Sequence, residues 1–349
     1  MKLLIITPFY YPHIGGMERS IYNLAKGLTH NNIEVSIYTT IFGGEITQDL
    51  GHKIYQHPDL SLSSWAEGIL EYILSHRSLD FCIFGGLGID IMNGLIPVFN
   101  YLHNVGVKTA LRIPTSDHIQ RHLGVDIFPE FLKKIDHFVC IDNLAVTYVQ
   151  NFAFPSQIHY VPNGVDLELF SNKKEWAQRK NKILYRGRLS KRKNIDLILD
   201  TAEILQDEFQ FILQGSESFG ESEYYRRIMG RAIALRNVEI IPESWHDIST
   251  YNDAKYFVLP SQSEGCPNSL LEAMACELFC ISSDIPENKT IIQSYGAYFK
   301  QDSHEMADLL RRSTSDPKTA DLVRSGKEYI RNNFSINTTI NKWLDIIKS

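Results

Sequence analysis

The sequence has few cysteines, no long apolar run and no excess of positive charge. Its five cysteines are an odd number, and their spacings match no pattern that binds zinc. Reduced thiols in a cytoplasmic compartment are therefore expected. No run of about 18 apolar residues is present, so no membrane span is predicted. The formal net charge of -6 provides no global basic field, so nucleic acid is not an expected partner.

The amino terminus, MKLLIITPFYYP, begins with a short apolar run. It lacks the charged first region, the longer apolar region and the small-residue cleavage site of a signal peptide. The composition, with 44% hydrophobic and 22% charged residues, is that of a soluble globular protein. A chain of 349 residues is longer than one hydrophobic core usually serves, so two domains are expected.

Short apolar segments alternate with segments of helical periodicity along the chain. This alternation predicts the α/β class, with a doubly wound parallel sheet in each domain and a polar linker near residues 165–182. The predicted strands are 3–9, 34–40, 80–86, 107–114, 137–142, 182–187, 209–215, 238–242, 256–260, 279–283 and 297–300.

Two glutamates flank the predicted start of a helix in the run SEGCPNSLLEAMAC. Glu264 lies in the loop that follows a strand, Pro267 suits the first helical turn, and Glu272 lies within the helix. Carboxylates accept hydrogen bonds from vicinal hydroxyls, and the helix start adds a positive partial charge. The pair is thus predicted to hold the hydroxyls of a sugar or a ribose; the alternative is two solvated surface glutamates.

Basic residues follow the strand that opens the second half of the chain. Arg188 comes directly after ILYRG, and Lys193 precedes the helical run NIDLILD. A guanidinium fork and a compact ammonium suit the oxygens of a diphosphate. The alternative is a pair of exposed basic residues, and the neighbouring Lys191 and Arg192 are expected to face water.

These segments together resemble glycosyltransferase family 4 (group 1), the retaining enzymes of the GT-B fold. Glu264 and Glu272 match the family's glutamate–seven–glutamate element, and ILYRGRLSKRKNIDLIL is similar to its donor-phosphate segment. PFYYPHIGGMERSIYNLAKGL is similar to its first loop and helix, and YVPNGVDLELF to its interdomain segment. The resemblance covers almost the entire chain. It implies two Rossmann-like domains that face each other across a cleft, with a last helix that returns to the first domain.

The resemblance also implies roles for individual residues. Glu264 would hold the transferred sugar and Glu272 the ribose, while Arg188 and Lys193 would bind the diphosphate. The expected donor-binding residues are Gly15, Gly16, Gly187, Arg188, Lys193, Gly215, Glu264, Gly265, Cys266, Pro267, Asn268, Ser269, Leu270 and Glu272. The expected catalytic residues are Glu264, Arg188, Lys193, His118 and Asp117.

The first domain would bind the acceptor, with Ser116, Asp117 and His118 as its candidate residues. His118 and His122 have the i, i+4 spacing of a metal pair, but no third ligand is evident, so no metal or other cofactor is expected. Asn163 either closes a turn through its side chain or touches the ligand, and the turn is favoured. Ser261 is expected to be a strand-end residue.

The implied activity is transfer of a hexose from a nucleoside diphosphate sugar, UDP- or GDP-linked, to a hydroxyl acceptor in polysaccharide or glycoconjugate synthesis. The implied domains are residues 1–166 with a helix at about 335–349 for the acceptor, and residues 167–334 for the donor. The expected location is the cytoplasm, either free or at the inner face of the membrane. Two alternatives stay open: a non-catalytic protein that binds nucleotide sugars, and a nicotinamide-dependent enzyme. The first glycine loop lacks the GxGxxG spacing, which weighs against the second.

Overall fold

The computed structural model describes residues 1–40, 51–58, 61–76, 78–87, 94–115, 130–172, 174–245 and 247–349. The chain forms two compact units. The first contains residues 1–163 and 336–349, and the second contains residues 164–335.

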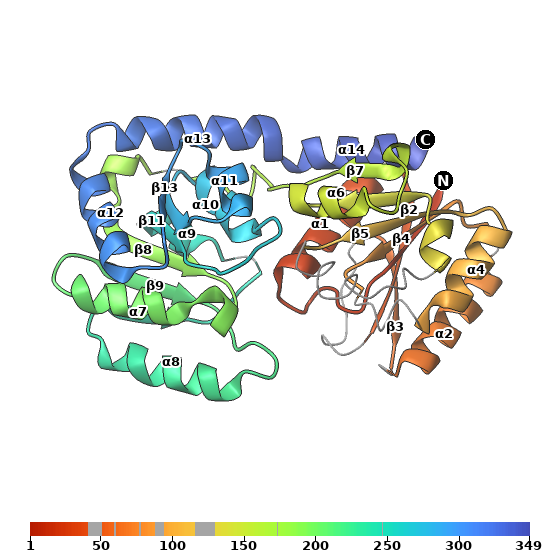
Figure 1. Ribbon diagram of the computed structural model, residues 1–349, viewed down its shortest axis with the longest axis horizontal. Coiled ribbons are helices and arrows are strands. Elements are labelled where there is room, and N and C mark those ends of the chain that lie inside the picture. Colours follow the sequence, from red (N-terminus) through yellow and green to blue (C-terminus); the bar gives the residue numbers. More distant parts are fainter. Residues whose placement is uncertain are drawn as a thin grey trace. The chain divides into compact units, whose positions relative to one another are not determined.

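The first unit is built on a seven-stranded parallel sheet in the order β3-β2-β1-β4-β5-β6-β7 (Figure 1). Its strands are β1 (Lys2–Ile6), β2 (Glu34–Thr40), β3 (Lys53–His57), β4 (Phe81–Gly85), β5 (Lys108–Ile113), β6 (His137–Cys140) and β7 (Ile158–Tyr160). Its helices are α1 (Gly16–His30), α2 (Leu62–Ser75), α4 (Ile96–Asn104), α6 (Asn143–Val149) and α14 (Ile336–Lys348), with short 3-10 turns at Glu130–Lys134 and Pro155–Gln157.

The two faces of this sheet pack into separate cores because strand side chains alternate in direction. Leu3 and Ile5 of β1 pack with α1 and α14, whereas Leu4 and Ile6 pack with α2, α4 and α6. The carboxyl-terminal helix α14 lies against α1 in this unit. The expected return of the last helix to the first domain is thus confirmed.

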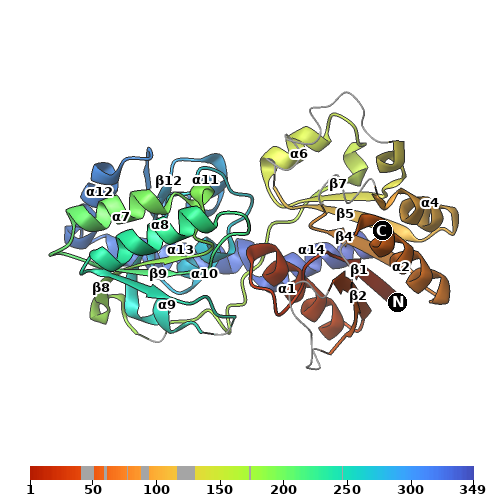
Figure 2. The same cartoon turned by 90° about the horizontal axis from the view of Figure 1, so that it is seen from below.

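The second unit is built on a six-stranded parallel sheet in the order β10-β9-β8-β11-β12-β13. Its strands are β8 (Lys180–Arg186), β9 (Gln210–Gln214), β10 (Val238–Ile241), β11 (Ala254–Leu259), β12 (Phe279–Ser283) and β13 (Ala297–Phe299). Its helices are α7 (Ile195–Ile204), α8 (Ser222–Ala234), α9 (Ser249–Asp253), α10 (Asn268–Ala275), α11 (Pro286–Ile292), α12 (Ser303–Ser315) and α13 (Thr319–Phe334), with 3-10 turns at Trp176–Gln178 and Lys191–Lys193. Helix α7 contacts both α8 and α12, and α10 packs against α13 (Figure 2).

The polar segment predicted to be a linker is instead attached to the second unit. Asn172 donates from Nδ2 to the carbonyl of Tyr251, and Trp176 donates from Nε1 to the carbonyl of Lys255. Strand β8 already begins at Lys180, within the predicted linker. The polarity of the segment predicted a linker. Polarity alone does not show that these side chains donate hydrogen bonds to backbone carbonyls of the second unit.

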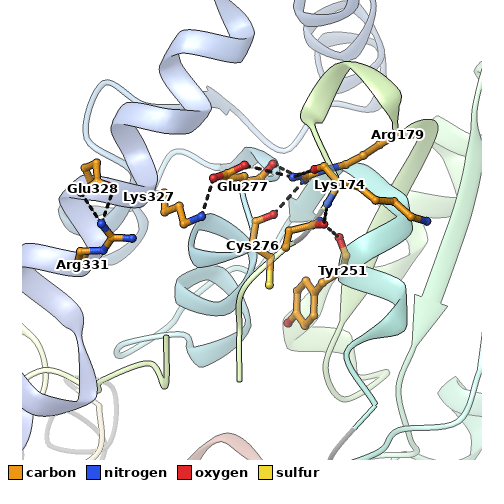
Figure 3. Close-up of polar contacts among 9 residues, drawn as sticks. Lys174, Arg179, Tyr251, Cys276, Glu277, Lys327, Glu328 and Arg331 are labelled. Atoms are coloured by element: carbon orange, nitrogen blue, oxygen red, sulfur yellow. Dashed lines mark hydrogen bonds and ion pairs between the residues drawn. The ribbon is translucent and has the colours of Figure 1, made fainter. Parts of the chain in front are cut away.

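Arg179 fixes the end of this segment to the carboxyl terminus of α10. Its buried guanidinium donates to the carbonyls of Cys276, at 3.0 Å, and of Glu277, at 2.6 Å (Figure 3). Glu277 has φ of +58°, a left-handed conformation that usually favours glycine after a helix. Its carboxylate lies between Arg179, at 3.4 Å, and Lys327, at 2.7 Å. These contacts explain how a glutamate is held at this helix end.

Replacing Arg179 by alanine is expected to lower the free energy of unfolding of the second unit by about 3 kcal/mol, because several carbonyl oxygens and Glu277 lose a buried partner. Urea unfolding followed by tryptophan fluorescence measures this loss. Lys174→Ala is the control, since its exposed ammonium pairs only at the surface with Asp253 and should cost less than about 1 kcal/mol. Equal losses in the two variants would show that Arg179 contributes no more than a surface charge.

Candidate active site

The carboxyl ends of the strands in the second sheet bring several predicted site residues to one edge. Arg186 at the end of β8 is in register with Gln214 at the end of β9, so the glycines that follow them, Gly187 and Gly215, are neighbours. Gly187 has φ of +150°, and a Cβ on Gly215 would lie 2.1 Å from the Gly187 carbonyl oxygen. Glycine is therefore required at Gly215 by the close approach of the two chains.

The segment between β8 and α7 is held in a defined shape by hydrogen bonds to its backbone groups. Leu189 donates its amide to the carbonyl of Ser216, at 2.8 Å, and Tyr185 donates from its hydroxyl to the carbonyl of Arg188, at 2.7 Å. The 3-10 turn Lys191–Lys193 follows, and α7 begins at Ile195. These contacts fix the backbone positions from which the side chains of Arg188 and Lys193 extend.

Lys193 and Glu264 form an ion pair in which Glu264 is buried and Lys193 is largely buried. Lys193 Nζ lies 2.5 Å from Glu264 Oε1, and the two side chains are 15% and 6% exposed. Burial opposes ionisation of Glu264, but the charges of Lys193 and Arg192 outweigh it and lower the pKa of the carboxyl. Glu264 is consequently a carboxylate at neutral pH and not one of two solvated surface glutamates.

Two further guanidinium groups act on this ion pair. Burial lowers the pKa of Lys193; Glu264 opposes this change, whereas Arg192 and Arg188 add to it through their positive charges. Arg192 donates to the carbonyl of Ser263, at 2.6 Å, and lies 3.9 Å from Glu264. Lys191 and Arg192 are both exposed, as expected. The arrangement gathers three cations near one carboxylate, which suits an anionic ligand with hydroxyl groups.

The loop after β11 places the remaining donor candidates at the start of α10. Gly265, Cys266 and Pro267 are buried, and Pro267 directly precedes the helix, which begins at Asn268. Ser269 and Leu270 complete its first turn. Ser261, at the end of the strand, is buried, and its carbonyl accepts from Ser283 Oγ at 2.6 Å.

Glu272 lies in a separate buried cluster of the second unit. Glu272 is 4% exposed, and its Oε2 accepts a hydrogen bond from the hydroxyl of Tyr251 at 2.7 Å. Burial, followed by the nearby Glu272 carboxylate, raises the pKa of Tyr251 well above its ordinary value, so Tyr251 remains a donor. One carboxylate oxygen of Glu272 is therefore held in a fixed orientation by Tyr251.

In the first unit, Gly15 lies in extended backbone before α1, and Gly16 is the first residue of that helix. Next to them, the buried carboxylate of Glu18 contacts His13 Nδ1 at 2.9 Å. Sequence reasoning missed this pair, although a histidine and a glutamate on either side of two glycines are visible in the sequence. Such a carboxylate fixes the orientation of the imidazole ring.

Asn163 forms hydrogen bonds with two elements of the first unit. Its Oδ1 accepts hydrogen bonds from Ser20 Oγ, at 2.9 Å, and from Arg112 Nη2, at 2.7 Å. The side chain thus joins α1 and the end of β5 within the first unit. The expected turn stays a prediction, and these two contacts could not be foreseen because both partners are distant in sequence.

The acceptor-side candidates Ser116, Asp117, His118 and His122 lie outside the described residues. Their roles stay predictions. Within the ranges described, no group of three or more His, Cys, Asp or Glu side chains is arranged to hold a metal ion. No helix in those ranges is long and apolar enough to cross a membrane.

Two family models match consecutive parts of the chain. The model described as Glycosyltransferase Family 4 matches residues 14–169, and the model described as Glycosyl transferases group 1 matches residues 166–330. The chain belongs to the group 1, family 4 glycosyltransferases. It is accordingly an enzyme of the glycosyltransferase class, as the sequence motifs predicted.

Curated relatives of this glycosyltransferase align over most of their length. The capsular polysaccharide biosynthesis glycosyltransferase CapH of Staphylococcus aureus is 27% identical over 276 residues, 74% of each chain. The GDP-mannose:cellobiosyl-diphosphopolyprenol alpha-mannosyltransferase of Xanthomonas campestris is 23% identical over 82% of this chain and 79% of its own.

Solved structures show the same architecture. The crystal structure of Anabaena HepE in complex with UDP-glucose has a TM-score of 0.80 and 13% sequence identity, and the match covers 100% of this chain and 99% of that one. At this identity the match shows the fold alone. The glycosyltransferase therefore has the GT-B fold, with two Rossmann-like domains.

Proposed function

We propose that this glycosyltransferase moves a hexose from a nucleoside diphosphate sugar to a hydroxyl acceptor, with retention of the anomeric configuration. The second unit takes the donor and the first unit takes the acceptor. The observation that carries the proposal is the ion pair of Lys193 and Glu264, in the segments that follow β8 and β11, with the charge of Arg188 nearby.

The chemistry of the step requires this combination of charges. The bond between the sugar's anomeric carbon and the diphosphate oxygen breaks, and negative charge builds up on the leaving group. Fixed cations that meet this charge stabilise the transition state. Lys193 and Arg188 supply them, while the Glu264 carboxylate accepts hydrogen bonds from the sugar hydroxyls. The acceptor oxygen forms the new bond on the same face, and its proton passes to an oxygen of the departing phosphate.

The expected donors are UDP- and GDP-hexoses, and the expected products are polysaccharides or other glycoconjugates. The names of the relatives support this range: one acts in capsular polysaccharide synthesis and one uses GDP-mannose, and the structure of HepE contains UDP-glucose. The proposed reaction needs no bound metal, because the side chains of Arg188 and Lys193 supply the positive charge.

A screen of UDP- and GDP-sugars should identify at least one that raises the melting temperature of the protein by several degrees. A ligand at 100 times its Kd stabilises the folded state by about 2.7 kcal/mol. Differential scanning fluorimetry measures the shift, and nuclear magnetic resonance of the product made from the best donor reports the anomeric configuration. Adenosine diphosphate sugars and free hexoses are the controls.

The absence of stabilisation by every UDP- and GDP-sugar would contradict the proposed donor class. Inversion of the anomeric configuration would contradict the retaining mechanism, and binding without turnover on any hydroxyl acceptor would favour a binding protein.

A further inference from the structure

A buried arginine that the proposed reaction does not use lies next to the donor site of the second unit. Arg186 is the last residue of β8, directly before Gly187, and is 4% exposed. A buried charge costs free energy unless it is paired and hydrogen-bonded, so its partners show what it does.

The guanidinium of Arg186 holds the backbone of the segment between β10 and α9. Nη2 donates to the carbonyl of Ser244, and Nη1 donates to the carbonyl of Asp247 at 3.2 Å. Gln214, the last residue of β9, lies beside Arg186 in the sheet and adds a third contact: its Nε2 donates to the carbonyl of Pro242 at 3.4 Å. The segment is thus tied down from the ends of β8 and β9.

The same guanidinium also contacts the cluster around Glu272. Its central carbon lies 5.3 Å from the centre of the Tyr251 ring, and the Tyr251 hydroxyl donates to Glu272 Oε2 at 2.7 Å. Burial would lower the pKa of Arg186, but the attractions of Tyr251, Glu272 and Glu243 outweigh it and raise the pKa. The positive charge is therefore stabilised by the groups it orients.

We propose that Arg186 is a positioning residue for the nucleoside part of the donor. It fixes the backbone at Ser244 and Asp247 and, through Tyr251, the carboxylate of Glu272. This role rests on the proposed function and on the role that the family resemblance implies for Glu272, which would hold the ribose. The segment after β10 lies where parallel α/β sheets bind ligands, at the carboxyl ends of the strands.

Only an arginine can make this set of contacts. Its planar fork reaches two carbonyl oxygens at once and its face packs on an aromatic ring, whereas a lysine offers one compact charge. Arg186→Lys keeps the charge and loses the fork, and Tyr251→Phe keeps the ring and loses the hydrogen bond to Glu272.

Isothermal titration with UDP, GDP and inorganic pyrophosphate tests the proposal. In Arg186→Lys, the Kd of the nucleotide that binds the wild type is expected to rise about 10-fold, or about 1.4 kcal/mol, as when one hydrogen bond to a charged group is lost. The Kd of pyrophosphate is expected to stay within about twofold, because Arg188 and Lys193 are unchanged. Tyr251→Phe should show the same selective loss.

Steady-state kinetics provide the second readout. The donor KM of Arg186→Lys is expected to rise about 10-fold while kcat changes less than about threefold, since the lost interaction is present in both the ground state and the transition state. Arg236→Met is the matched control, because it removes an exposed guanidinium paired with Asp207. Circular dichroism shows whether Arg186→Met folds. If it folds, its affinity for the nucleotide should fall further than that of Arg186→Lys. If it does not fold, Arg186→Lys and Tyr251→Phe test the inference.

Three results would overturn the inference. Equal weakening of nucleotide and pyrophosphate binding in Arg186→Lys would indicate a general disturbance of the unit. Unchanged binding of both ligands in Arg186→Lys and Tyr251→Phe would show that neither residue positions the nucleoside. A wild-type protein that binds pyrophosphate but neither UDP nor GDP would refute the proposed donor class, and the role of Arg186 with it.

Discussion

Replacing Lys193 by alanine is expected to lower kcat for sugar transfer by about 100-fold or more. The Nζ atom of Lys193 is held 2.5 Å from Glu264 Oε1, at the start of α7. This charge meets the negative charge that grows on the departing diphosphate, so its contribution is larger in the transition state than in the bound donor. Transfer assays under saturating donor should therefore show the loss in kcat as well as in kcat/KM.

Lys191→Ala is the matched control for this prediction. Lys191 belongs to the same 3-10 turn, and its backbone amide donates to the Glu221 carboxylate, a hydrogen bond that alanine would preserve. The kcat of Lys191→Ala for sugar transfer should stay within about threefold of the wild-type value. An unchanged kcat in Lys193→Ala would show that Lys193 takes no part in the mechanism.

Replacing Glu264 is expected to affect both activity and stability. Glu264→Ala removes the carboxylate that would hold the sugar hydroxyls, so transfer should fall about 100-fold or more. It also leaves the largely buried Lys193 without its partner, which should lower the free energy of unfolding by about 3 kcal/mol. Glu264→Gln keeps the shape of the side chain and loses only the charge. Transfer assays and urea unfolding measure the two effects.

The double variant of Lys193 and Glu264 separates the ion pair from the chemistry. In Glu264→Gln/Lys193→Met no unpaired charge is buried, so stability should recover relative to Glu264→Gln while transfer stays low. Glu223→Gln, on the exposed face of α8, controls for the loss of one carboxylate. Recovery of transfer together with stability would mean that the pair is structural.

Strand and helix positions were predictable where apolar residues dominate. Strand β4, FCIFG, lies within the predicted segment 80–86, and all five of its residues are buried, as is typical of an apolar run in a parallel sheet. Strand β3, KIYQH, was missed because each of its residues after the first is only partly buried and half are polar. Strand β7 was missed for a similar reason, since all three residues are partly buried.

The site was predictable as a set of residues but not as a set of contacts. Spacing and resemblance singled out Lys193 and Glu264, yet no pattern within the sequence shows that residues 71 positions apart form a buried ion pair. Arg186 was missed because a single arginine at the end of a strand has no signature. Arg179 was missed because its partners are carbonyl oxygens, which every residue carries.

The crystal structure of the protein with its nucleoside diphosphate sugar tests the central claim most directly. We expect oxygens of the diphosphate within hydrogen-bond distance, about 3 Å, of Lys193 Nζ and the guanidinium of Arg188, with sugar hydroxyls on Glu264 and the ribose on Glu272. A donor whose diphosphate is bound elsewhere, with Lys193 and Glu264 still paired and untouched by the ligand, would contradict the account.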